Sequence, residues 1–156
     1  RTKDLIIFED KMDKVAKNLY MCTDDGSYGF HGNVTVMLDE LVTNRGMEYD
    51  QAIVIGPMIM MKFACLATKK LNIPTIVSLN TIMVDGTGMC GACRISIGDD
   101  VKFACVDGPE FDGWLVNFDE AMKRQQMFKS EEGRKILRKQ DGPTHSSPNC
   151  QIGGKH

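Results

Sequence analysis

Residues 51–79, QAIVIGPMIMMKFACLATKKLNIPTIVSL, predict a strand, a helix and a second strand in succession, the repeating unit of an α/β fold. The apolar run 51–55 ends at Gly56-Pro57, and Pro57 suits the first turn of a helix. A second apolar strand is predicted at 73–79. Continuous apolar strands of this kind are typical of a parallel sheet that is covered on both faces. The helix is expected to bury one apolar face, formed by Met60, Phe63, Ala64, Ala67 and Leu71.

The residues before this unit continue the same alternation. Apolar runs predict strands at 4–8 and 18–23, and an Asp- and Gly-rich loop follows at 24–32. Asn33 is expected to cap a helix with an apolar face at Val34, Met37, Leu38, Leu41 and Val42. Ligands of parallel sheets bind beyond the carboxyl ends of the strands, a position that the loops at 23–29 and 55–58 would occupy.

The composition changes after residue 80, where glycine and cysteine become frequent. Residues 93–97 and 101–105 predict a β-hairpin around a short loop at 98–100. Asn117, with Glu120 three residues later, resembles a capping box that opens a helix through about residue 128. A second short helix is predicted at 130–139, and residues 141–156 are expected to form an extended tail.

Three of the six cysteines lie close together among glycines, which suggests a metal site. Cys90 and Cys93 are separated by two residues, and the hairpin would bring Cys105 back towards them. Counted from Asp85, the spacing is that of the C-x4-C-x2-C…C layout of [2Fe–2S] sites, with Asp in the first position. An iron–sulfur cluster, a zinc ion and thiols without metal all remain open on spacing alone. Zinc would need a fourth ligand from Asp85, His145 or Cys150.

The other residues argue against several classes of function. Cys22 and Cys65 occupy apolar positions and are expected to be inert core residues. The net charge of −2 gives no strong field for nucleic acid or an acidic membrane, and the basic run 134–139 is expected to be a solvated helix face. No stretch approaches the roughly 18 apolar residues of a membrane span. The three histidines are scattered and give no sign of hydrolytic catalysis. A cytoplasmic location is expected from free thiols and the lack of an export signal.

Residues 84–94 and 103–113 closely resemble the C-terminal region of a known family, the flavin and [2Fe–2S] electron-transfer subunits related to ferredoxin–NADP reductase. That family includes the electron-transfer subunit of dihydroorotate dehydrogenase, the small subunit of ferredoxin:NADP oxidoreductase, which is also known as a sulfide dehydrogenase subunit, and hydrogenase-associated subunits. Residues 22–29 and 55–62 resemble it as well, so the likeness runs from residue 1 to about 130.

This resemblance implies a [2Fe–2S] cluster held by Cys90, Cys93 and Cys105. The dihydroorotate dehydrogenase type has a cysteine where Asp85 stands, whereas the ferredoxin:NADP oxidoreductase type has an aspartate that serves as the fourth ligand. Asp85 is therefore expected to be the fourth ligand, and the alternative is that it only caps the loop. A carboxylate is a harder donor than a thiolate and should alter the reduction potential.

The resemblance also implies a nucleotide site in residues 1–80. The residues expected to line it for NAD(P)H are Thr23, Asp24, Asp25, Gly26, Ser27, Gly56, Pro57 and Met58. Physically, a helix that opens at Pro57 offers N–H groups to phosphate or ribose, and the aspartates could accept from ribose hydroxyls. The alternative is a turn and a helix start without a ligand.

We expect an α/β fold with a truncated, ferredoxin-reductase-like parallel sheet and covering helices. The expected division is a partial NAD(P)-binding domain at 1–80, a [2Fe–2S] subdomain at 81–115, helices at 116–140 and a tail at 141–156. The family's flavin-binding barrel and its first strand–helix unit are missing, so the chain is expected to be a piece of a longer protein. Flavin binding should be lost, nucleotide binding weak or lost, and an exposed sheet edge could pair with a second copy.

The complete protein is expected to pass a hydride from NAD(P)H to FAD, and then single electrons to the cluster and a larger catalytic partner subunit, with a ferredoxin-type acceptor as one option. This chain alone would be inactive. The rival reading is a zinc-stabilised or metal-free module that docks subunits without redox activity. The tail could serve as a docking arm.

Overall fold

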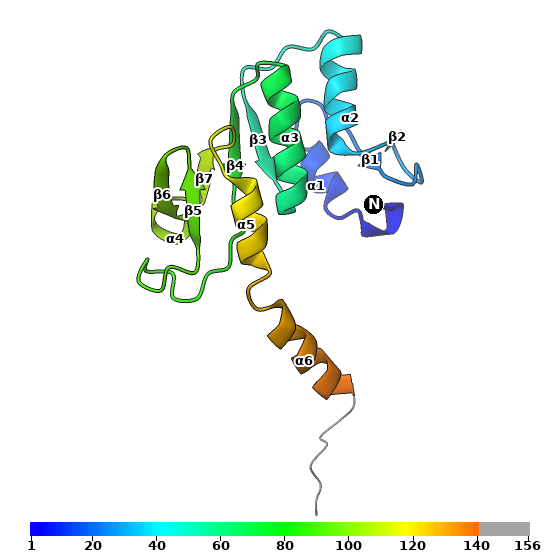
Figure 1. The fold of residues 1–156 in the computed structure, drawn as a ribbon. Helices are drawn as coiled ribbons and strands as arrows, with labels where there is room; N and C mark the ends of the chain where they lie inside the picture. Colours follow the sequence, from blue (N-terminus) through cyan, green and yellow to red (C-terminus); the bar gives the residue numbers. More distant parts are fainter. Residues whose placement is uncertain (141–156) are drawn as a thin grey trace, which may run out of the picture.

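The computed structural model describes residues 1–140, with side chains through residue 136, and its centre is a three-stranded sheet (Figure 1). Strand β3 (Ala52–Ile55) pairs in parallel with β4 (Thr75–Ser78), and β7 (Glu110–Asp112) pairs antiparallel with β4 on its other side. Helix α3 (Met58–Lys70) connects the two parallel strands. The predicted strand–helix–strand unit is therefore confirmed, and the expected α/β class with it.

Helix α3 buries Ala64 as expected, but the rest of its buried face differs from the one expected. Met58, Met61, Ala64, Cys65 and Thr68 are buried, whereas Phe63 is 54% exposed. The expectation was wrong because this helix is apolar on most of its circumference, so the periodicity of its apolar residues does not select one face. The sheet and helix α5 (Phe118–Gln125), which contact α3, decide which stripe is covered.

Strand β3 is covered on one face only. Val54 packs against the core cluster that contains Met61 and Val77, while Ile53 and Ile55 are 66% and 70% exposed. The expectation of burial on both faces is wrong for this strand. Because β3 lies at the end of the three-stranded sheet, its outer edge has no partner strand among the described residues.

The N-terminal region differs most from expectation. Residues 4–8 do not form a strand: a short 3₁₀ helix η1 (Lys3–Leu5) and helix α1 (Glu9–Asp13) occupy this region, and Ile7 is 72% exposed. A strand needs a hydrogen-bonded neighbour, and none of the described strands lies beside these residues. The expected strand at 18–23 is reduced to β1 (Cys22–Thr23), which pairs in parallel with β2 (Phe30–His31).

Helix α2 (Val34–Asp39) begins as predicted. The Asn33 side chain accepts hydrogen bonds from the backbone N–H groups of Thr35 and Val36, each at 3.1 Å, which confirms the cap. The helix continues as the π-helical turn η2 (Glu40–Asn44) and packs against α3. Met37 and Leu41 are buried, as expected.

The predicted hairpin is confirmed as β5 (Arg94–Ile97) and β6 (Asp100–Phe103), followed by helix α4 (Ala104–Asp107). Ile97 lies opposite Asp100, so Gly98 and Asp99 form a two-residue turn, and Gly98 has the positive φ that such turns require. The Asn117 N–H donates to the Ser96 carbonyl at 2.9 Å and ties the hairpin to the start of α5.

The C-terminal helices have slightly different bounds from those expected. Asn117 caps α5 by accepting from the Glu120 N–H at 3.1 Å, and α5 ends at Gln125 rather than near residue 128. Helix α6 (Lys129–Gln140) extends away from the body of the molecule (Figure 1). The expected tail at 141–156, with His145 and Cys150, lies outside the described residues.

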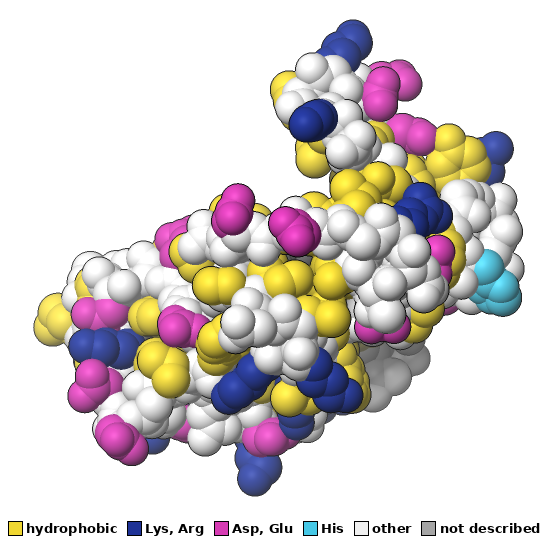
Figure 2. Space-filling view, turned by 90° about the horizontal axis from the view of Figure 1, so that it is seen from above, with side chains coloured by type: hydrophobic (Ala, Val, Ile, Leu, Met, Phe, Trp, Pro, Cys, Tyr) yellow, Lys and Arg dark blue, Asp and Glu magenta, His cyan; other side chains and the backbone are white. Residues whose placement is uncertain are grey.

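The surface agrees with the modest net charge. Figure 2 shows basic, acidic and hydrophobic side chains interspersed over the face in view, without a broad area of one charge. No helix among residues 1–140 combines the length and apolar character that a membrane crossing needs.

Candidate metal centre

The loop before the hairpin is folded around the carboxylate of Asp85. One carboxylate oxygen accepts from the Thr87 N–H at 2.9 Å, and the other accepts from the Cys90 N–H at 2.8 Å. Gly86 and Gly88 both have positive φ, which lets the chain turn tightly between these donors. The N–H of Thr87, and then that of Cys90, lower the pKa of Asp85, so the carboxylate is ionised at neutral pH.

Two of the candidate cysteines meet at the open end of the hairpin. Arg94 lies opposite Phe103, and the next backbone hydrogen bond runs from Ala104 N to the Cys93 carbonyl at 3.2 Å. The sulfur atoms of Cys93 and Cys105 are 3.2 Å apart, and Cys93 is 2% exposed. Contact with the Cys93 thiol raises the pKa of Cys105, while the Gly88 N–H directed at Cys105 lowers it.

The other two candidate ligands stand apart from this pair. Cys90 is exposed, and its sulfur accepts from the Ala92 N–H at 3.5 Å. Within the described residues, no group of three or more His, Cys, Asp or Glu side chains is arranged to hold a metal ion. The structure thus joins Cys93 with Cys105, and links Asp85 to the backbone of Cys90.

The donor set nevertheless fits a cluster chemically. Converging thiols are the usual ligands of iron–sulfur clusters, and the third thiol lies on the same glycine-rich loop. Gly91, directly after Cys90, has positive φ, so the loop changes direction beside that thiol. Backbone N–H groups at Gly88 and Ala92 point towards sulfur, as is typical of sites that stabilise anionic sulfur.

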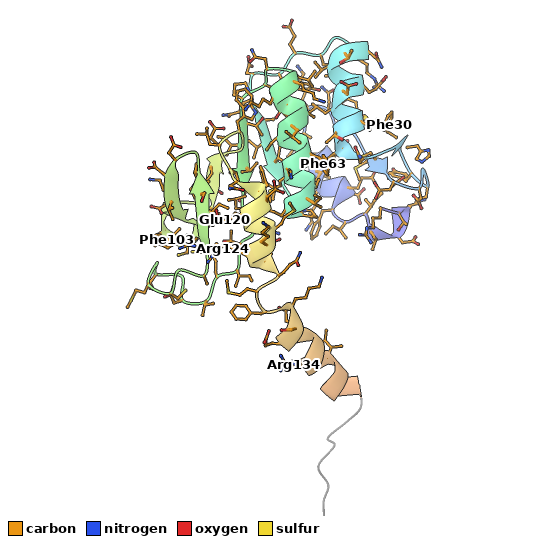
Figure 3. The ribbon with its side chains drawn as sticks, viewed as in Figure 1. Phe30, Phe63, Phe103, Glu120, Arg124 and Arg134 are labelled. Carbon is orange, nitrogen blue, oxygen red and sulfur yellow. The ribbon has the colours of Figure 1, made fainter. Side chains whose placement is uncertain are left out.

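Helix α5 holds this loop at both ends, a role that the sequence did not indicate. The Arg124 guanidinium donates to the carbonyls of Gly91 and Ala92 at 2.8 and 3.3 Å. One residue later, Gln125 donates to the Asn80 carbonyl at 2.9 Å. Figure 3 shows Arg124 on α5, on the side that faces the hairpin. One feature of the sequence could have indicated that this face of α5 contacts the hairpin. Glu120 and Arg124 are four residues apart, so their polar side chains share a helix face.

The predicted nucleotide residues at 23–27 form a closed turn. The Thr23 hydroxyl donates to the Tyr28 carbonyl at 2.8 Å and accepts from the Tyr28 N–H at 3.1 Å. The Asp25 carboxylate accepts from the Ser27 hydroxyl at 2.6 Å, and this bond lowers the pKa of Asp25. Asp24 and Gly26 are exposed.

The second predicted group, Gly56, Pro57 and Met58, opens α3. Pro57 immediately precedes the helix, and Met58 is 3% exposed within the core. A Cβ atom at Gly56 would lie 2.5 Å from the Cε atom of Met60. Strand β1 and strand β3 belong to different sheets, so strand pairing does not join the two groups.

A surface pocket of about 560 Å³ lies beside the first group, at residues that the sequence reading did not select. Its lining includes Lys3, Phe8, Lys11 and Tyr28. The Tyr28 hydroxyl donates to Glu9 at 2.6 Å, and this carboxylate raises the pKa of Tyr28. The pocket thus combines aromatic side chains with both charges, because Glu9 and Asp10 line it beside Lys3 and Lys11.

Residues 80–117 match the iron–sulfur cluster binding domain of dihydroorotate dehydrogenase B. This segment contains all four candidate ligands, Asp85, Cys90, Cys93 and Cys105. The chain belongs to the electron-transfer subunit family of dihydroorotate dehydrogenase B. A homologue of that subunit from Thermotoga maritima is 47% identical over 132 residues, which are 85% of this chain and 46% of the relative.

Other relatives support the same family. An uncharacterised protein from the adh 3′ region of Clostridium beijerinckii is 63% identical over 99% of this chain and 52% of its own length. A solved chain of an NADH-dependent reduced ferredoxin–NADP oxidoreductase, described for flavin-based electron bifurcation, has a TM-score of 0.76 and 44% identity over 90% of this chain. The chain spans about half the length of these relatives. The expected family and ferredoxin-reductase-like fold class are confirmed.

Proposed function

We propose that this chain is the iron–sulfur part of an electron-transfer subunit of a flavin-dependent oxidoreductase. In the complete protein it relays electrons between FAD, reduced by NAD(P)H, and a larger catalytic partner subunit. The observation that carries the proposal is the convergence of Cys93 and Cys105 inside a segment that matches an iron–sulfur cluster binding domain.

We assign the ligands as Asp85, Cys90, Cys93 and Cys105, and the group as a [2Fe–2S] cluster. A bound [2Fe–2S] cluster takes up and releases one electron at a time. The hairpin supplies a rigid frame for Cys93 and Cys105, because the strand pairing fixes both positions. The loop supplies Cys90 and the ionised carboxylate of Asp85, whose present hydrogen bonds are to backbone N–H groups that can be exchanged for water.

The surroundings suit exchange of electrons with another protein. Cys93 is buried, while Cys90 and the loop lie at the surface. Exposed apolar side chains surround the loop in sequence: Met83 is 46%, Val84 66%, Met89 89% and Val106 55% exposed. Apolar residues gathered at a surface are typical of a binding face, so we place the partner subunit there.

We assign a nucleotide role to the turn at 23–27 and to the start of α3, in the complete protein. Asp24 is exposed and can accept from hydroxyl groups, and the first N–H groups of α3 are free to bind an anion. The neighbouring pocket adds the aromatic ring of Tyr28 and side chains of both charges, since Lys3 and Lys11 line it together with Glu9 and Asp10. Isothermal titration of the complete protein with NADH and NADPH, repeated with Asp24→Ala, tests this assignment; equal heats from the two proteins would contradict it.

The deciding experiment is metal analysis of the chain purified without oxygen. We expect two irons and two acid-labile sulfides per chain, a visible charge-transfer band, and an electron paramagnetic resonance signal after reduction. One tightly bound zinc without sulfide, unchanged after reconstitution with iron and sulfide, would contradict the proposal and point to a structural docking module.

A series at Asp85 tests the fourth ligand. Asp85→Cys should keep the cluster with a different reduction potential, and Asp85→Ala should lower the iron content at least several-fold. Asp99→Ala, in the exposed hairpin turn, is the matched control and should behave as the wild type. Full iron content and an unchanged potential in Asp85→Ala would show that Asp85 only caps the loop.

A further inference from the structure

Arg124 reaches from α5 to the segment between two of the proposed ligands. One terminal nitrogen of its guanidinium donates to the Gly91 carbonyl at 2.8 Å and to the Ala92 carbonyl at 3.3 Å. These two residues are the whole of the spacer between Cys90 and Cys93. A single side chain, 32 and 33 positions away in sequence, therefore holds the spacer against α5.

The charge of Arg124 is not matched by a carboxylate in the described part of the chain. The ion pairs found there join Glu40 with Arg45, Lys62 with Asp119, Asp100 with Lys102, and Glu131 with Arg134. Glu120, one turn earlier on α5, instead accepts from the Ser96 hydroxyl at 2.5 Å. The Nε atom of Arg124 is buried and has no hydrogen-bond partner.

Such an arrangement is costly unless an anion completes it. A partly buried cation that contacts only carbonyl dipoles has lost water without gaining a counter-charge. The proposed cluster would supply that charge. Two Fe³⁺ and two S²⁻ carry +2, and three thiolates with one carboxylate carry −4, so the oxidised site is −2 and the reduced site is −3.

We propose that Arg124 is a positioning residue for the cluster, which clamps the Cys90–Cys93 spacer and sets a positive charge beside it. This inference rests on the proposed function. The added electron makes the site more negative, so the cation stabilises the reduced state more than the oxidised state and raises the reduction potential. The clamp also keeps Cys93 at its buried position next to Cys105.

Three variants separate the charge from the clamp. Arg124→Met keeps the length of the apolar stem and removes both charge and donors. Arg124→Lys keeps the charge but replaces the planar fork with a compact ammonium. Arg134→Met, on the projecting helix α6, removes an exposed arginine whose only described contact is with Glu131, and is the matched control.

The first readout is the reduction potential of the reconstituted chain. Arg124→Met should shift the reduction equilibrium about tenfold towards the oxidised state, which is about 59 mV for a one-electron couple. Arg124→Lys should recover most of this shift, and Arg134→Met should show none. A wild-type potential in Arg124→Met would overturn the charge role.

The second readout needs no cluster. In the metal-free chain, alkylation of Cys93 by iodoacetamide is compared with that of exposed Cys90 by peptide mass spectrometry. The relative rate at Cys93 should rise about tenfold in Arg124→Met and by less in Arg124→Lys; an unchanged rate in both would overturn the clamp. If Arg124→Met does not fold, Arg124→Lys decides by the same ratio. A wild-type chain without iron and sulfide would refute the proposed function, while a raised Cys93 rate would still establish the clamp.

Discussion

The sulfur atoms of Cys93 and Cys105 lie 3.2 Å apart although the two residues are 12 positions apart in sequence. The β5–β6 register explains this, because each cysteine lies beyond the last strand pair, Arg94 with Phe103. The two thiols are therefore placed by the backbone pairing rather than by their own contact. A site built on a hairpin in this way is held before any metal arrives.

We predict that Cys93→Ser or Cys105→Ser lowers the iron and sulfide content of the anaerobically purified chain at least tenfold. A hydroxyl is a poor substitute for thiolate at an iron–sulfur centre. Cys22→Ser, in the short strand β1, is the control and should retain full content. Iron and sulfide retained by both of the first two variants would place the cluster elsewhere.

Gly113 is predicted to be intolerant of any side chain. A Cβ there would lie 2.6 Å from the Cys65 sulfur and 2.9 Å from Val77 Cγ1, inside the core. Gly113→Ala should lower the free energy of unfolding by about 1–3 kcal/mol, measured by urea denaturation. Gly133→Ala has open space around it in α6 and should not destabilise the fold. Equal stability of the two variants would contradict the packing argument.

We predict that the folded chain loses stability at alkaline pH because Cys65 is buried. Burial, with a smaller contribution from Asp112, raises the pKa of Cys65 from 9.0 to about 11. Below pH 9 the thiol is neutral in both states, so the shift has no effect. Between pH 9 and 11 the unfolded chain loses the proton first, and the free energy of unfolding falls by up to about 2–3 kcal/mol.

Urea denaturation of the metal-free chain from pH 7 to 11 checks this, with Cys65→Ala as the reference that lacks the thiol. The stability difference between the two proteins should shrink or change sign as the pH rises. Parallel pH profiles would show that Cys65 titrates normally in the folded chain.

The uncovered side of β3 predicts self-association. Ile53 is 66% exposed on a strand whose outer edge has no partner strand in the described part of the chain, a combination that favours edge-to-edge pairing with a second copy. Ile53→Lys should weaken the association about tenfold, measured by sedimentation velocity over a range of concentrations. Val15→Lys changes an 80% exposed residue outside the sheets and should have no effect. Equal association of both variants with the wild type would exclude this edge.

Features that depend on near neighbours in sequence could be predicted well. The Asn33 cap needs only the N–H groups of the next turn, and the hairpin needs only two β-prone runs around Gly98. The strand expected at 4–8 failed for the opposite reason, since an apolar run becomes a strand only beside a partner strand. The face of α3 that is buried also depended on distant neighbours. Met58 and Met61 are buried rather than the expected Met60 and Phe63, because the sheet and α5 pack against that side of the helix.

The candidate site divides in the same way. The cysteine spacing, the glycines that allow the loop to turn, and the hairpin that returns Cys105 are all local, so residues 84–113 carried enough information to indicate a metal centre and its family. The contact of Arg124 with Gly91 and Ala92 is not local, because it exists only when α5 packs against the hairpin. Only the tertiary packing therefore placed the positive charge of Arg124 beside the cysteine loop. The two residues in contact, Arg124 and Gly91, are 33 positions apart in sequence, so their contact depends on how the helix and the hairpin assemble.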